Sequence, residues 1–204
     1  MAPAAFSLRP AQLTFRQEEW PDGLTYLENY IQDEEAERLV REIDATPWRT
    51  DLKRRVQHYG YRYDYKARQA RREDYLGPLP DLFQNLAERL TSEGHFLAVP
   101  DQVIVNEYQP GQGISAHIDC QPCFGEAIAS LSLLSACVMR FASQKSSRHM
   151  DLLLQPDSLL VMAGEARHDW THAIPARKTD LVEGKKSQRT RRISLTFRQM
   201  KFEN

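Results

Sequence analysis

The sequence predicts a mainly β domain with flanking helices, folded as an antiparallel barrel or jelly roll. From residue 100 onward, short apolar or alternating runs follow one another and are separated by Gly, Pro and Asp, which is typical of strands in such folds. Helical periodicity is confined to residues before 100. The length of 204 residues, 41% of them hydrophobic, suits one domain with a substantial core.

Two helices are expected in the N-terminal half. The first covers residues 33–45, where Asp33 serves as N-cap and acids fill the first turn. Its apolar face is made of Ala36, Leu39, Val40 and Ile43. The second covers about residues 80–92, with a leucine at every fourth position and Gly94 as the stop signal.

The stretch from Arg54 to Arg72 interleaves arginines with aromatic side chains. Residues 49–72 contain nine Lys or Arg residues, whereas residues 18–44 contain ten acids. Because bases stack on aromatic rings and phosphates bind arginine, the stretch is a candidate nucleic-acid surface. Its tyrosines fit an edge strand equally well. The sequence leaves both interpretations open.

Five strands are expected in the C-terminal half, at residues 102–108, 128–134, 137–141, 158–162 and 192–197. No repeat, low-complexity tract or Pro/Gly linker divides the chain. We therefore expect one domain over residues 1–204, with the helices in residues 1–99 and the strand-rich core in residues 100–204.

Composition excludes several classes of protein. No apolar run approaches the ~18 residues that a membrane span requires, so we expect no membrane insertion. The first ten residues lack the charged flank and apolar stretch of a signal peptide. Three cysteines cannot form a full disulfide framework, which favours a reducing compartment. We expect a cytoplasmic protein.

A motif with metal-binding character runs from Asn106 to Asp119, with the sequence N-E-Y-Q-P-G-Q-G-I-S-A-H-I-D. His117 and Asp119 are two residues apart, so in an extended chain they project to the same face. His172 follows the Gly-Glu-Ala-Arg turn and can return a second imidazole to the same metal. Two histidines and one carboxylate on one face are typical of non-heme Fe(II) sites that keep open positions.

A pair of arginines strengthens this interpretation. Arg192 and Arg198 are six residues apart on an expected strand and therefore face the same side. Two guanidinium groups that face a cavity need anions to neutralise them. A dicarboxylate would meet this need.

With these motifs in order and at these spacings, the sequence resembles the AlkB family of Fe(II) and 2-oxoglutarate-dependent dioxygenases. The resemblance covers about residues 50–200. It implies a double-stranded β-helix core of the jelly-roll, cupin-like type, preceded by N-terminal helices and a nucleotide-recognition lid. It implies that Fe(II), 2-oxoglutarate and O2 take part in the reaction. Local details are closer to the AlkB-like domain of the animal tRNA wobble-uridine hydroxylase than to the archetypal bacterial repair enzyme.

The resemblance also assigns roles to individual residues. The iron ligands and catalytic residues would be His117, Asp119 and His172. The 2-oxoglutarate contacts would be Asn106, Tyr108, Arg192, Ser194, Thr196 and Arg198. Arg192 would pair with the distal carboxylate, and Arg198 would lie near the metal-bound one. The substrate contacts would come from Arg54, Tyr61, Tyr63 and Gln121. Gln121 stands where repair enzymes of the family often carry a second acid, which puts the preferred base in doubt.

The implied activity is oxidative dealkylation of N-alkylated nucleobases, such as 1-methyladenine, 3-methylcytosine or etheno adducts, in DNA or RNA. The products would be succinate, CO2 and an aldehyde. The substrate base must be single-stranded or flipped out, and we expect a monomer. The alternatives are hydroxylation of a modified tRNA base or of a protein side chain, and a non-catalytic nucleic-acid-binding module.

Cys120 and Cys123 form a C-x-x-C pair directly after Asp119. Such a pair suggests zinc or redox chemistry, but no second cysteine pair accompanies it. We interpret both as loop residues near the iron, open to oxidation.

Overall fold

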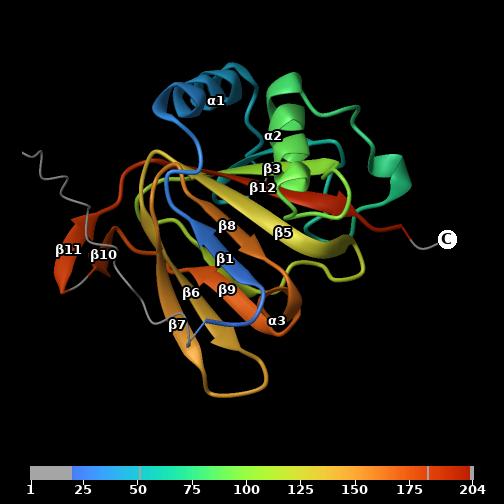
Figure 1. Cartoon of the computed structure of the whole chain (residues 1–204). Coiled ribbons are helices and arrows are strands. Elements are labelled where there is room, and N and C mark those ends of the chain that lie inside the picture. Colours follow the sequence, from blue (N-terminus) through green and yellow to red (C-terminus); the bar gives the residue numbers. More distant parts are fainter. Residues whose placement is uncertain (1–19, 51, 183, 203–204) are drawn as a thin grey trace, which may run out of the picture.

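The computed structural model describes residues 20–50, 52–182 and 184–202, and it has the expected mainly β, jelly-roll architecture (Figure 1). An antiparallel six-stranded sheet, the major sheet, has the order β1-β8-β5-β12-β3-β2, and a four-stranded sheet, the minor sheet, has the order β4-β9-β6-β7. The major sheet contains β1 (Leu24–Leu27), β8 (Leu159–Met162), β5 (Phe124–Leu133), β12 (Arg192–Met200), β3 (Gln102–Tyr108) and β2 (Arg55–Tyr59). The minor sheet contains β4 (Ile114–His117), β9 (Trp170–Ile174), β6 (Cys137–Ser143) and β7 (His149–Leu154). The hairpin β10 (Thr179–Val182) and β11 (Lys185–Gln188) stands apart from both.

The helices α1 (Asp33–Ala45) and α2 (Asp81–Ser92) cover one face of the major sheet (Figure 1). Alternate residues of each strand point to opposite faces. Val103, Val105, Ile193, Leu195 and Phe197 therefore share a buried core with Leu39 and Ile43 of α1 and Phe83, Leu86 and Leu90 of α2. The intervening residues of β3 and β12 face the minor sheet. Strand alternation thus leaves one face of the major sheet for the site.

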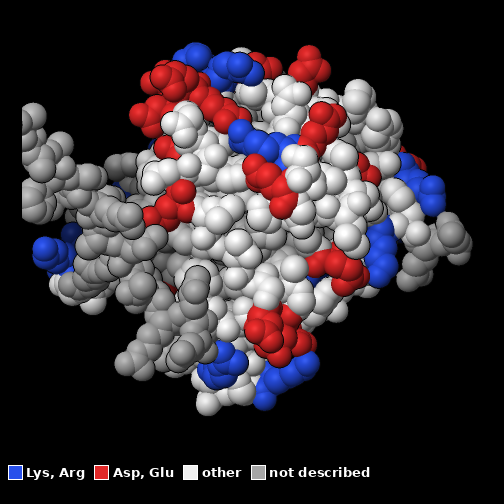
Figure 2. Space-filling model, viewed as in Figure 1, with Lys and Arg blue, Asp and Glu red and all other residues white. Residues whose placement is uncertain are grey.

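Both predicted helices are present, but the predicted N-cap of α1 is wrong. The N-cap is Gln32, which makes no side-chain cap hydrogen bond, and Asp33 is the first helical residue. Acidic side chains gather over α1 (Figure 2). Two of them pair with residues outside the helix: Glu35 with Arg89 of α2, and Asp44 with Arg191. The acidic face of α1 thus helps to dock the helix.

The N-terminal half contributes strands as well as helices. β1 pairs with β8, and β2 pairs with β3 at the edge of the major sheet. The edge-strand interpretation therefore holds for residues 55–59. After Gly60, the chain is held by a bridge between Tyr61 and Tyr75 and by an ion pair between Arg62 and Asp74. The β core is not confined to residues 100–204.

The segment Gly-Glu-Ala-Arg, expected as a turn, is a short helix, α3 (Gly164–His168). It lies between β8 and β9, directly before the strand that carries His172. Among the described residues, no helix is both long enough and apolar enough to span a membrane.

Candidate active site

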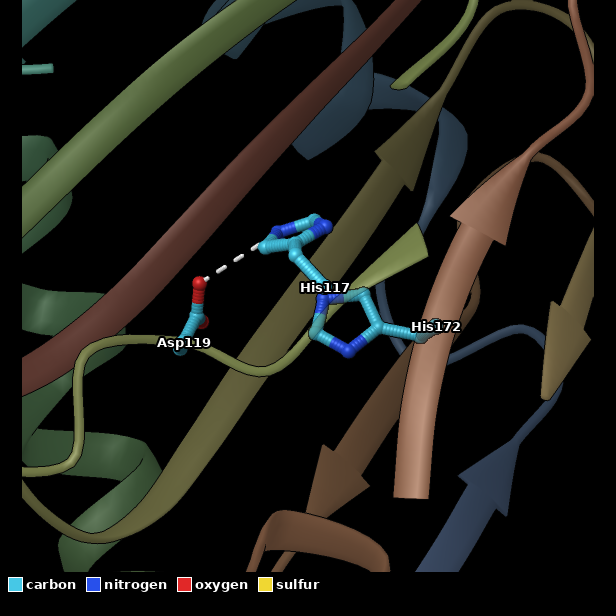
Figure 3. Close-up of side chains that lie close together, drawn as sticks. All are labelled: His117, Asp119 and His172. Carbon is cyan, nitrogen blue, oxygen red and sulfur yellow. Dashed lines mark ion pairs between the residues drawn. The ribbon is translucent and has the colours of Figure 1, made fainter. Parts of the chain in front are cut away.

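Two histidines and one carboxylate meet at the minor sheet. β4 pairs with β9 so that His117 lies directly opposite His172, a position in which facing Cβ atoms are about 5 Å apart. Asp119 follows two residues after His117 in the loop that leaves β4. Potential ligand atoms of the three side chains all lie within 4.8 Å of one another, and Figure 3 shows the side chains converging. One divalent ion can therefore contact all three.

The Pro-Gly-Gln-Gly turn before β4 makes this pairing possible. Gly111 has φ +92°, a conformation that L side chains rarely adopt. A Cβ atom on Gly113 would lie 2.1 Å from the carbonyl oxygen of Ile174 on β9. The two glycines therefore let β4 approach β9 closely enough to set His117 opposite His172.

Hydrogen bonds orient the His117 ring. Its Nδ1 lies 2.8 Å from the carbonyl oxygen of Ser115. Because a carbonyl only accepts, Nδ1 carries the proton and Nε2 keeps its lone pair for a metal. Nε2 faces Asp119 Oδ1 at 3.6 Å, the ion pair drawn in Figure 3.

Two arginines hold Asp119 and its loop. Arg198 donates through Nε and Nη2 to the two carboxylate oxygens of Asp119, at 3.1 and 3.3 Å. Arg167 on α3 donates to the backbone carbonyl oxygens of Asp119 and Cys120, at 2.9 and 3.2 Å. Sequence reasoning missed this role of Arg167, although it is the arginine of the Gly-Glu-Ala-Arg motif.

The electrostatics favour metal-binding protonation states at neutral pH. Burial alone would raise the pKa of Asp119, but the positive charge of Arg198 is the main effect that outweighs it and holds that pKa well below 3.8. Burial, reinforced by nearby His117, lowers the pKa of His172 from 6.5 to about 4. An ionised carboxylate and a neutral imidazole are the forms that bind metal.

The three side chains open into a cavity of about 1120 Å³ lined by residues of both sheets. Apart from Tyr61, all residues that the motifs assign to the site line this cavity: Arg54, Tyr63, Asn106, Tyr108, His117, Asp119, Gln121, His172, Arg192, Ser194, Thr196 and Arg198. The register explains why, because Arg192 pairs with Tyr108 and Ser194 pairs with Asn106 across β12 and β3. Cross-strand partners project to the same face.

Arg192 has hydrogen-bonding capacity left over. Its side chain is 3% exposed, and Nη2 donates to Ser132 Oγ at 2.9 Å. Its Nε and Nη1 have no partner among the described residues. Buried guanidinium donors are normally satisfied, so these two point to a missing anion. The distal carboxylate of 2-oxoglutarate fits this need.

Arg198 lies beside Asp119, and the expectation that it lies near the metal-bound carboxylate of 2-oxoglutarate stays a prediction. Its guanidinium is already occupied by Asp119 and, through Nη1, by Gln102 Oε1 at 3.2 Å. The two arginines of the R-x5-R strand therefore stand in different surroundings. Arg192 has free donors, and Arg198 positions a potential metal ligand.

We use the name lid for residues 53–72, which the resemblance identifies with nucleotide recognition. Some of its side chains line the cavity, and others lie outside it. Arg54 reaches inward, donates from Nε to Asn106 Oδ1 at 2.8 Å and lies 6.0 Å from the centre of the Tyr108 ring. Tyr63 also lines the cavity. Tyr61, expected to contact substrate, instead packs against Tyr75 and Phe202, with ring centres 5.0 and 5.3 Å away. Tyr61 and Tyr63 are thus only two residues apart, yet Tyr63 lines the cavity and Tyr61 packs outside it.

The loop after Asp119 is closed by a disulfide between Cys120 and Cys123. Both cysteines lie next to the metal-binding triad in this loop, as expected, and the disulfide is an oxidised form of the C-x-x-C pair. Both Sγ atoms lie close to the carbonyl oxygen of Arg68, at 3.5 and 3.7 Å, so the disulfide packs on the lid. The neighbouring Gln121 donates from its amide to the carbonyl oxygen of His168, at 3.0 Å.

Comparison with known proteins agrees with this arrangement. Residues 23–198 match the family model described as the 2OG-Fe(II) oxygenase superfamily. The mouse protein tRNA (carboxymethyluridine(34)-5-O)-methyltransferase ALKBH8 is 36% identical over 205 residues, covering 89% of this chain and 31% of the mouse protein. The Arabidopsis thaliana Alkylated DNA repair protein ALKBH8 homolog is 35% identical over 202 residues, covering 88% of this chain and 58% of the plant protein. The chain thus spans less than two thirds of both relatives.

A solved structure of OsALKBH1 superimposes with a TM-score of 0.65 at 18% identity, covering 87% of this chain and 96% of that one. This likeness concerns the fold, and it agrees with the two-sheet architecture described above. The family model, the relatives and the donor set lead to the same assignment. The chain belongs to the 2OG-Fe(II) oxygenase superfamily, has AlkB-family proteins among its relatives, and is an Fe(II)/2-oxoglutarate dioxygenase that uses O2.

Proposed function

We propose that this enzyme oxidises an alkyl group on a nucleobase of DNA or RNA. In this proposal His117, Asp119 and His172 bind Fe(II), and Arg192 binds the distal carboxylate of 2-oxoglutarate. One observation carries the assignment: the three potential ligands and the unpartnered donors of Arg192 share one cavity. The other cosubstrate contacts are assigned to Asn106, Tyr108, Ser194, Thr196 and Arg198, which line the same cavity.

When bound, Fe(II) with 2-oxoglutarate and O2 supplies the oxidising chemistry, and 2-oxoglutarate leaves as succinate and CO2. The chain's own residues hold the reactants in position. Arg198 keeps Asp119 ionised, and burial keeps His172 neutral, so the donor set is ready at neutral pH. Arg192 anchors one end of the cosubstrate and thereby restricts the orientation of the other.

Dealkylation follows from where the oxygen atom enters. For N-methylated bases such as 1-methyladenine and 3-methylcytosine, one oxygen atom of O2 is inserted into a C–H bond of the methyl carbon. The resulting hemiaminal loses its C–N bond, the nitrogen takes up the hydroxyl proton, and an aldehyde leaves. For etheno adducts the oxygen atom adds across the C=C bond, and water opens the epoxide to a diol that releases glyoxal as both C–N bonds break. The unmodified base is restored in both cases.

The cavity supports a base that has left the helix stack. His172 and Asp119 are each 8% exposed, so a base paired inside a duplex could not reach them. The substrate in this proposal is therefore single-stranded or flipped out. Two exposed cations, Lys53 and Arg68, lie at the cavity and suit the flanking phosphates. In this proposal the enzyme is a monomer and acts in the cytoplasm.

Hydroxylation of a tRNA base without dealkylation is the second candidate. Two observations favour it: the mouse relative carries the name of a tRNA-modifying enzyme, and the neutral Gln121 follows Asp119 by two positions. When the oxidised carbon is attached to a ring carbon instead of to nitrogen, the hydroxyl group stays on the base.

Mass spectrometry of modified oligonucleotides separates the two. Incubation with Fe(II), ascorbate and 2-oxoglutarate should yield succinate together with either formaldehyde or a base heavier by one oxygen atom. Formaldehyde identifies dealkylation, and the added oxygen identifies hydroxylation. The His172→Ala protein serves as the control and should give neither product. Failure of the unaltered protein to turn over any modified oligonucleotide would contradict the proposal.

A further inference from the structure

The side chains around the cavity are unequal in charge. Among the described residues, five cationic side chains line the cavity: Lys53, Arg54, Arg68, Arg192 and Arg198. The lining contains a single acid, Asp119, within the part of the chain that the structure describes. The acids of α1 are not among the residues that line the cavity.

The cations form two groups with different surroundings. Arg192 and Arg198 lie on β12, beside the sites proposed for 2-oxoglutarate and the metal. Lys53, Arg54 and Arg68 come from the lid. Lys53 and Arg68 are exposed and form no ion pair with a described residue. Arg54 donates to the uncharged amide of Asn106, which leaves its charge uncompensated.

Carboxylates near the mouth are engaged elsewhere. Glu126 pairs with the His168 ring at 2.9 Å and does not line the cavity. Asp64 accepts hydrogen bonds from the backbone amides of Lys66 and Ala67, at 2.8 and 3.0 Å. Gln121 places a neutral amide on the lining. The hydrogen bonds leave the charge of Asp64 in place, but neither Asp64 nor Glu126 lines the cavity, so Asp119 is the one described carboxylate on the lining.

Loading the site does not alter this balance. Fe(II) and the 2-oxoglutarate dianion carry opposite and equal formal charges, so together they add no net charge to the cavity. Asp119 is balanced by Arg198, with which it shares two hydrogen bonds. Arg192 and the three lid cations remain as an excess of positive charge around the space left for substrate.

We propose that this site selects modified bases without a positive charge, neutral or anionic, and disfavours cationic ones. The inference rests on the proposed function and narrows its substrate class. 1-Methyladenine and 3-methylcytosine carry a positive charge at neutral pH, so the lid cations repel them. N6-Methyladenine and etheno adducts are neutral, and 5-carboxymethyluracil is anionic. Arg54 is half-buried and therefore less screened than the exposed Lys53 and Arg68, so we expect it to contribute most to this discrimination.

Two isomers provide the sharpest test, because 1-methyladenine and N6-methyladenine have the same composition and differ in charge. Each is placed at the same position of one single-stranded oligonucleotide. Attraction to the phosphates is then common to both, and the ratio of their kcat/KM values reports the base. We expect N6-methyladenine to be favoured at least about tenfold, equivalent to about 1.4 kcal/mol. An oligonucleotide containing 5-carboxymethyluracil tests the anionic case.

Binding is measured separately from turnover. The two oligonucleotides compete for metal-free protein, and fluorescence anisotropy gives the dissociation constant of each. The ratio of these constants should also favour N6-methyladenine. Arg68→Glu and Gln121→Glu each add negative charge to the lining and should shift both ratios toward 1-methyladenine by about tenfold or less. The Arg68 variant keeps the backbone carbonyl that contacts the disulfide. Lys186→Glu, the same charge change on the exposed strand β11, should leave both ratios unchanged.

The outcomes are distinguishable. Equal or faster turnover of 1-methyladenine by the unaltered protein would overturn the charge selection and leave the nucleobase oxidation standing. Ratios that respond to Lys186→Glu as strongly as to Arg68→Glu would also overturn it. Absence of succinate formation and of specific binding with every modified oligonucleotide would overturn the proposed function itself.

Discussion

Replacement of Arg192 by Met tests the assignment of the cosubstrate site most directly. The substitution keeps an unbranched side chain of similar size to the aliphatic part of arginine and removes every donor. Two of these donors, Nε and Nη1, are buried and unpartnered. A charge-assisted contact of this kind contributes about 1.5 to 3 kcal/mol in net terms. The dissociation constant for 2-oxoglutarate should therefore rise about 10-fold to 150-fold.

Protein stability should respond in the opposite sense. Without cosubstrate, the variant no longer buries unsatisfied donors, so its melting temperature should equal or exceed that of the unaltered protein. At 2-oxoglutarate concentrations of about 100 times Kd, ligand binding stabilises the unaltered protein by about 2.7 kcal/mol. For a chain of this size that energy raises the melting temperature by roughly 5 to 10 °C.

Thermal unfolding with and without 2-oxoglutarate measures both effects, with Mn(II) replacing Fe(II) to prevent oxidation. The Arg192→Met protein should show a much smaller shift at the same concentration. Arg140→Gln, which alters an exposed arginine paired with Asp151, is the matched control and should shift like the unaltered protein. An unchanged shift in the Arg192 variant would refute the assignment.

Three further predictions follow from the described contacts. His172→Ala should abolish stoichiometric iron binding, measured by metal analysis of anaerobically loaded protein; retention of one iron per chain would exclude this ligand. Glu107 is buried and accepts hydrogen bonds from Arg55 and Arg191. The bond from Arg55 is the largest effect on the pKa of Glu107, and with the bond from Arg191 it outweighs burial and lowers that pKa below 4.5. Because the folded pKa is lowered, the stabilisation is present above about pH 4.5 and is lost as pH falls through the folded pKa. Urea unfolding should show that Glu107→Gln loses about 1.5 to 3 kcal/mol at pH 7 and less at pH 4; a pH-independent difference would argue against an ionised Glu107. Phe141→Ala, at a fully buried position beside His172, should cost about 3 to 5 kcal/mol of unfolding free energy, and a loss below about 1 kcal/mol would contradict its place in the core.

The sequence predicts elements where burial follows a clear period. The bounds of α1 and β3 agree with the predicted ranges 33–45 and 102–108, because each has a continuous apolar pattern. β4 and β9 escaped prediction since their positions carry metal-binding and polar residues in place of an apolar alternation. β11 has the sequence Lys-Lys-Ser-Gln and is wholly exposed, so no burial pattern exists to reveal it.

The candidate site could be predicted from motif spacing, since residues two apart on a strand share a face whatever the tertiary fold. Arg192 and Arg198, an even number of residues apart on β12, share a face for the same reason. Asp119 lies just past the end of β4, and there too the spacing from His117 predicts that the two side chains lie close together. Contacts between motifs could not be predicted in the same way. The pairing of Arg198 with Asp119 and the anchoring of the loop by Arg167 depend on how two sheets and α3 are placed in space. The position of Tyr61 outside the cavity has the same origin.

The Cys120–Cys123 link has a practical bearing on how this enzyme is handled at the bench. Asp119 precedes the link directly, and the carbonyl oxygen of Arg68 lies against both sulfur atoms. Dithiothreitol, often added to protect ferrous proteins during purification, would open the ring and leave this loop held by hydrogen bonds alone, among them those from Arg167, Arg198 and Gln121. Samples prepared with and without thiols are therefore two chemical forms of the protein. Ascorbate is the suitable reductant for the disulfide form, because it contains no thiol to exchange with the Cys120–Cys123 bond.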